Sequence, residues 1–198
     1  MPIIAAPEPP PIVQRLVPYG EARRADMAAY ARRHYGIDDW RLRDPRVVVL
    51  HFTVNGSLRA TYDAFAPNRP DPELGERPGV CAHLGVGRDG TVWQFARLSF
   101  MCRHTVGLNH VALGVEAVGF SAAEIRANRR QYRATLRTLQ WLRCRSRIPV
   151  ADVIGHNENR EHRLHRERVA RLRTQTHGDW TRAQMRLVRR DLRALGAC

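Results

Sequence analysis

The sequence predicts an α/β fold with a mixed central β-sheet flanked by helices. Residues 46–54 (RVVVLHFTV) form a continuous apolar, largely β-branched run, which is typical of a central strand covered on both faces. Residues 80–96 hold two alternating segments around Arg88-Asp89-Gly90, a strong signal for a tight hairpin turn. Helical patterns alternate with these strands, and the hairpin makes the sheet mixed rather than purely parallel.

The other elements follow from periodicity and from helix-end signals. Gly36 is the expected C-cap of a first helix, and Ser121 begins a long helix with Ile125 and Leu139 on its apolar face. In chain order we expect a helix over 21–34, a helix over 57–66, a strand over 112–119, the long helix from 121, a short strand over 150–155 and a C-terminal helix over 180–195.

The length of 198 residues fits one domain with a real hydrophobic core. Residues 1–19 are rich in proline and predict an extended N-terminal arm, so the catalytic or binding domain is expected over residues 20–198. No apolar run approaches the roughly 18–20 residues needed to span a bilayer. The first residues lack the basic start of a secretory signal. We expect a monomer.

The formal net charge is +14, and all 33 basic residues are arginine, because the chain contains no lysine. Such a cationic surface favours polyanions, namely nucleic acid, anionic lipid or anionic cell-wall polymer.

Four cysteines lie at irregular spacings without a CxxC motif, which argues against a zinc finger. Cys81 and Cys102 can form a disulfide in an oxidising compartment. A chain of this length needs no disulfide to fold, however, so we expect two or more buried free thiols.

Two histidines and one aspartate occupy positions suited to a metal site. His51 lies inside the first core strand, His156 ends the last strand, and Asp179 precedes the C-terminal helix. Two neutral imidazoles and one carboxylate leave a fourth position open on a tetrahedral zinc ion, which is the arrangement of catalytic sites. In the alternative interpretation, His51 is a satisfied core histidine and Asp179 is the N-cap of the helix.

Four sequence blocks resemble the zinc-dependent N-acetylmuramoyl-L-alanine amidases of the type 2 family, whose fold is shared with the peptidoglycan recognition proteins. The blocks occur in the family's order between about residues 45 and 180. They are VVVLHFT at 47–53, VCAHLGVGRDGTVWQ at 80–94, HTVGLN at 104–109 leading into LGVEAVG at 113–119, and IGH at 154–156 followed by THGD at 176–179.

The resemblance implies that His51, His156 and Asp179 bind zinc. It also implies that Glu116 assists the metal-bound water in proton transfer. His177 stands where many relatives carry a lysine or threonine that stabilises the developing oxyanion. An imidazolium can donate the same hydrogen bond.

The resemblance also suggests substrate-binding residues. His104 and Asn109 match the stretch in which relatives contact the muramyl-peptide. His83 is a third candidate, although a strand residue at this position can equally pack beside the site. Ala82 stands where some relatives carry a tyrosine, so we expect no tyrosine contribution there.

The implied function is zinc-dependent hydrolysis of the amide bond between N-acetylmuramic acid and L-alanine in peptidoglycan, in a secreted or cell-envelope protein. A non-catalytic peptidoglycan-binding module is the alternative, but loss of a zinc ligand is its usual mark and all three ligands are present. A nucleic-acid binder explains the charge but gives no reason for His51, Glu116 and Asp179, so no specific nucleic-acid partner is expected.

Overall fold

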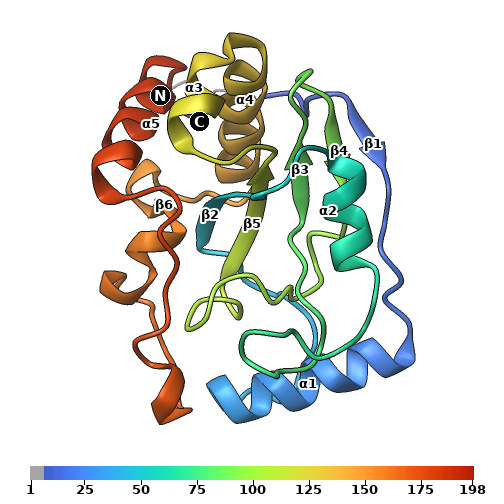
Figure 1. The fold of residues 1–198 in the computed structure, drawn as a ribbon. Helices are drawn as coiled ribbons and strands as arrows, with labels where there is room; N and C mark the ends of the chain where they lie inside the picture. The colour runs from blue at the N-terminus through green and yellow to red at the C-terminus, as the bar shows by residue number, and fades with distance from the viewer. Residues whose placement is uncertain (1–6) are drawn as a thin grey trace.

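A six-stranded sheet in the order β1-β4-β3-β5-β2-β6 organises the chain (Figure 1). The computed structural model describes residues 7–198, so the first six residues of the predicted arm lie outside it. Only β3 and β4 pair antiparallel, and every other pair is parallel, which confirms the mixed α/β fold. The strands are β1 (Ile12–Gln14), β2 (Val47–Phe52), β3 (Leu84–Val86), β4 (Val92–Gln94), β5 (Ala112–Ala117) and β6 (Val153–Gly155).

The helices are α1 (Glu21–Tyr35), α2 (Leu58–Phe65), α3 (Ala122–Ala127), α4 (Arg129–Arg145) and α5 (Arg182–Ala194). Short 3₁₀ turns cover Val150–Asp152, His156–Glu161 and Ala170–Leu172. In Figure 1, α1 crosses the lower end of the molecule, below the ends of the central strands.

Several predicted elements differ from the structure in their bounds. The long helix expected from Ser121 is two helices, because the Asn128 side chain accepts a hydrogen bond from the Gln131 amide and starts α4 anew. Within the proline-rich segment, Ile12–Gln14 adds an edge strand parallel to β4, which the sequence did not reveal. The C-terminal helix begins after Thr181, whose side chain is its N-cap, so Asp179 does not cap it.

The two faces of the sheet have different partners. Alternate residues of β2 point to opposite faces, and Val48 and Leu50 pack in the cluster that also holds the inner faces of α4 and α5. Val47 and Val49 lie on the other face, in a smaller cluster with Leu108 and neighbouring apolar residues. His51 follows the same alternation and therefore points away from α4 and α5.

Both cysteine pairs are disulfide-bonded, so the expectation of buried free thiols is wrong. Cys81 lies beside the segment that carries Cys102, since the Cys81 amide donates to the Arg103 carbonyl, and the two Cα atoms are 5.2 Å apart. Cys144, near the end of α4, pairs with Cys198 at the C-terminus. Two disulfides are typical of proteins that fold in an oxidising environment outside the cell. Among the described residues, no helix has both the length and the apolar character needed to cross a bilayer.

His83 is a structural member of the sheet. Its side chain is fully buried, its Nδ1 accepts a hydrogen bond from the Gly114 amide at 2.9 Å, and its Nε2 donates to the Phe100 carbonyl at 2.8 Å. Burial lowers the pKa of His83 from 6.5 to about 4. The imidazole is therefore neutral, and it ties β5 to the segment before Cys102.

We predict that replacing both Cys144 and Cys198 by alanine lowers the free energy of unfolding by about 2–4 kcal/mol, because the bond closes a long loop in the unfolded chain. The two cysteines are 54 residues apart in sequence. Urea unfolding of the variant and the wild type measures the difference. Equal midpoints and slopes for the two proteins would contradict the prediction.

We also predict an acid-dependent loss of stability from His83. Its folded-state pKa, about 4, is below the ordinary value of 6.5, so the unfolded chain binds the proton first. Stability is therefore lost as the pH falls from about 6.5 towards 4, and this one group costs about 2 kcal/mol at pH 5. Urea unfolding at pH 7 and pH 5 should show a smaller acid loss in His83→Gln than in the wild type. The same loss in both proteins would exclude His83 as the cause.

Candidate active site

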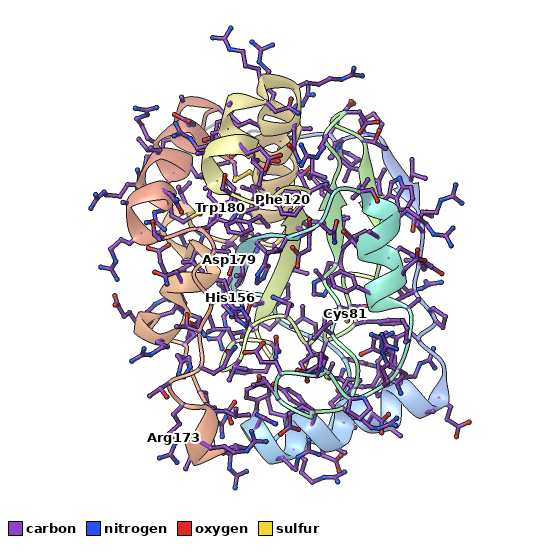
Figure 2. The ribbon with its side chains drawn as sticks, in the orientation of Figure 1. Cys81, Phe120, His156, Arg173, Asp179 and Trp180 are labelled. Atoms are coloured by element: carbon purple, nitrogen blue, oxygen red, sulfur yellow. A yellow bond between two sulfur atoms is a disulfide. The ribbon has the colours of Figure 1, made fainter. Side chains whose placement is uncertain are left out.

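The three predicted metal ligands meet at one edge of the sheet. His51 lies near the carboxyl end of β2, His156 directly follows β6, and Asp179 lies on the segment that enters α5. β2 pairs directly with β6, which places both histidines at the same end of neighbouring strands. All three residues are buried, and Figure 2 shows His156 and Asp179 next to each other near the centre of the molecule.

One donor atom from each member of this triad lies within 4.8 Å of the other two. His51 Nδ1 is 3.1 Å from His156 Nδ1 and 3.2 Å from Asp179 Oδ2, and His156 Nδ1 is 3.5 Å from Asp179 Oδ1. A tetrahedral ion with ligand distances of 2.0–2.1 Å requires donor separations of about 3.3–3.4 Å. The side chains are thus already arranged to hold a metal ion.

Gly155 makes this arrangement possible. A Cβ atom at this position would lie only 1.8 Å from the Trp180 carbonyl oxygen, so only glycine admits the chain that carries Asp179. The Asn157 amide donates to the Asp179 carbonyl at 3.1 Å, and the Trp180 side chain is fully buried in the main core. The Gly-His pair therefore positions both His156 and Asp179.

Glu116 lies beside the triad. It is paired in register with His51 on the neighbouring parallel strand, so both side chains point to the same face of the sheet. Its carboxylate is buried, and Oε2 has no hydrogen-bond partner among residues 7–198. Burial, reinforced by Asp179 and opposed by His51, raises the pKa of Glu116 to about 7. A carboxyl group with this pKa can take up and release a proton at neutral pH.

A pocket of about 460 Å³ opens over these groups. Its floor is polar, and the walls include apolar side chains from β2, α2 and the segment before β3. The lining residues are His51, Phe52, Val54, Phe65, Glu73, Val80, Cys81, Arg103, His104, Glu116, His156, His177, Gly178 and Asp179. Glu73 and Arg103 were missed by the sequence analysis. Glu73 comes from a proline-rich loop without a pattern that points to a site.

His177 lies at the rim of the pocket, with 45% of its side chain exposed. Its Nε2 is 3.2 Å from Glu73 Oε2, and its ring centroid is 4.7 Å from that of His156. The imidazole thus reaches the mouth of the pocket beside a ligand candidate. Ala82, by contrast, is fully buried in a cluster with Phe65 and Phe95 and does not line the pocket.

Only one of the three substrate-binding candidates reaches the pocket. His104 lines it and places Nδ1 3.1 Å from His51 Nε2. Asn109 is fully buried, and its Oδ1 accepts from the amides of His104 and Thr105. His83 is held by backbone groups, as described above. Asn109 and His83 are both fully buried and are not among the residues that line this pocket.

Several solved structures share this fold. N-acetylmuramoyl-L-alanine amidase LysC from Clostridium intestinale URNW is 16% identical with a TM-score of 0.60, covering 93% of this chain and 98% of that chain. The endolysine amidase LysCS from the same organism is 17% identical with a TM-score of 0.54, covering 76% and 84%. PlyL is 14% identical with a TM-score of 0.53, covering 75% and 82%.

Comparison with curated protein sequences gives no match. The family profile described as N-acetylmuramoyl-L-alanine amidase (Amidase_2) matches residues 41–179, which is most of the chain. The matched segment contains the whole triad, Glu116 and His177, and its ends enclose the sheet from β2 to β6. The chain therefore belongs to the N-acetylmuramoyl-L-alanine amidases, hydrolases that cleave the amide bond between N-acetylmuramic acid and L-alanine in peptidoglycan.

Proposed function

We propose that the chain is a zinc amidase in which His51, His156 and Asp179 hold the ion and Glu116 transfers the proton. The observation that carries the proposal is the cluster of two imidazoles and one carboxylate, with contacts of 3.1–3.5 Å between the three side chains, next to a buried carboxyl group. Residues 20–198 would then form the catalytic unit.

The donor set favours zinc over harder cations. Calcium and magnesium prefer oxygen ligands, whereas two imidazole nitrogens and one carboxylate oxygen are a common catalytic zinc set. Three protein ligands leave one coordination position for water or substrate. Zinc bound here would lower the pKa of its bound water to about 7 and polarise the scissile carbonyl group.

Glu116 is the proton carrier in this proposal. Its Oε2 atom, which has no hydrogen-bond partner in the described chain, accepts the proton of the attacking water and delivers it to the leaving nitrogen of L-alanine. Burial without a hydrogen-bond partner disfavours the charged form of this carboxyl group, which favours uptake of the proton. The same carboxyl group can then pass the proton to the leaving nitrogen.

His177 is proposed to donate a hydrogen bond to the oxyanion that develops on the scissile carbonyl. It reaches the pocket from the rim, two residues before Asp179. The chain has no lysine to take this place. Glu73 Oε2 lies 3.2 Å from His177 Nε2 and can orient the imidazole at the rim of the pocket.

The substrate in this proposal is a muramyl-peptide bound in the pocket, in a secreted or cell-envelope setting that suits the two disulfides. A peptidoglycan-binding module without catalysis needs neither the open metal site nor a buried carboxyl group beside it. The costly burial of Glu116 therefore supports the enzyme over the binding module.

The proposal predicts a metal-dependent product. Purified muropeptides incubated with the zinc-loaded protein should release free stem peptides that begin with L-alanine, detected by mass spectrometry. A chelated sample should leave the muropeptides intact. Intact muropeptides in both samples, with binding retained, would instead establish the binding module.

Two substitutions separate metal binding from proton transfer. Asp179→Ala should abolish both zinc retention and turnover, since it removes one of three ligands. Glu116→Gln should lower kcat by about 10²- to 10⁴-fold, because a neutral amide cannot carry the proton. Zinc content by elemental analysis should stay at wild-type level in Glu116→Gln. Full activity of this variant would disprove the role of Glu116.

A further inference from the structure

Both ring nitrogens of His51 have polar neighbours, on opposite sides of the ring. Nδ1 faces His156 and Asp179 at 3.1 and 3.2 Å. Nε2 points away from the triad and lies 3.1 Å from His104 Nδ1 and 3.3 Å from Thr105 Oγ1. The two imidazole rings of His51 and His104 meet edge to face, with their planes 85° apart.

The position of the hydrogens follows from these neighbours. A ring nitrogen that binds a metal carries no hydrogen, so His51 in the proposed site is protonated at Nε2 and needs an acceptor there. His104 Nε2 lies 3.4 Å from the Ala112 carbonyl oxygen, which only accepts. His104 therefore carries its hydrogen on Nε2 and presents a bare Nδ1 to His51.

We propose that His104 Nδ1 is the acceptor that fixes the tautomer and ring orientation of His51, with the Thr105 hydroxyl oxygen, 3.3 Å from His51 Nε2, as a second acceptor beside it. This inference rests on the proposed metal site. It makes His104 a positioning residue that acts through His51, whereas the sequence suggested a contact with substrate. Such outer partners of metal-binding histidines typically contribute 10- to 100-fold to metal affinity.

The backbone that carries His104 is held in place by Asn109, which links it to α1. Asn109 Oδ1 accepts from the His104 amide at 2.9 Å and from the Thr105 amide at 2.7 Å. Asn109 Nδ2 donates to the hydroxyl groups of Tyr30 and Tyr35 on α1, at 3.1 and 3.2 Å. Every polar atom of the Asn109 side chain is thus used inside the protein, and the turn at residues 104–105 has one defined conformation.

The His104 ring packs against the sheet at Gly114 of β5. A Cβ atom at Gly114 would lie 2.9 Å from the His104 Cγ atom, so only glycine leaves room for the ring against β5. The ring also lies close to the buried His83, with centroids 5.9 Å apart. The ring is therefore packed directly against β5 and cannot move towards the strand.

Two substitutions at His104 test the acceptor. His104→Phe keeps a planar ring and removes the acceptor, and it should raise the zinc dissociation constant 10- to 100-fold in a chelator competition. His104→Asn places an amide oxygen near the position of Nδ1 and should stay within about threefold of the wild type. His162→Phe is the matched control. His162 contacts Asp152 and the Leu164 amide, which belong neither to the triad nor to the contacts of Asn109, so zinc affinity should not change.

The wild type gives a second readout that needs no variant. The imidazole nitrogen shifts of the zinc-loaded protein, measured by NMR, should show His51 and His104 each protonated at Nε2. A hydrogen on His104 Nδ1 would overturn the proposal, even if the variants failed to fold.

Other outcomes separate this inference from the proposed function. Unchanged zinc affinity in His104→Phe together with a raised KM would show that His104 contacts substrate, and would overturn the positioning role. Equal losses in His104→Phe and His104→Asn would overturn the acceptor role. Absence of zinc binding in the wild type would remove the metal site itself, and the proposed function with it.

Discussion

The parallel pairing of β2 with both β5 and β6 is the constraint on which the site depends. This register sets His51 beside Glu116 and sets Leu50 beside Gly155, so the turn after β6 delivers His156 to the same edge. Because side chains alternate along a strand, a slip of one residue would move Glu116 to the face covered by α4 and α5. The large apolar cluster between the sheet and these two helices therefore holds the strand register, and the register places His51 and Glu116 on the opposite face.

The same burial that fixes the register also sets the properties of the polar groups. Glu116 and His83 are both enclosed by the sheet, and burial shifts the pKa of each towards its neutral form, to about 7 for Glu116 and about 4 for His83. For His83 the result is a neutral structural hydrogen-bonding group. For Glu116, which faces the pocket, it is a carboxyl group that exchanges protons near neutral pH. Both residues are buried, and they differ in that Glu116 lines the pocket whereas His83 does not.

Sequence alone predicted β2 to β6, but not β1, and it predicted the convergence of His51, His156 and Asp179, because strand ends and ordered motifs carry that information locally. It did not predict the pairing of Cys144 with Cys198, since 54 residues separate them and only the packing of α4 against the C-terminal segment brings them together. Asn109 lies within a recognisable motif, but its burial depends on tyrosines about 75–80 residues earlier. The motif therefore indicated that Asn109 lies near the site, but it did not reveal which groups the side chain contacts.

The hydrogen bonds of Asn109 give α1 a part in the site although this helix contributes no side chain to the pocket. Tyr30 and Tyr35 pack in a separate apolar cluster with Met27, and from there the chain of polar contacts runs through Asn109 to the turn that carries His104. Docking of α1 buries these tyrosine hydroxyls, which accept from Asn109 and lie 3.5 Å from each other. In the proposed arrangement, the orientation of His51 therefore depends, through His104 and Asn109, on a helix that packs outside the main core.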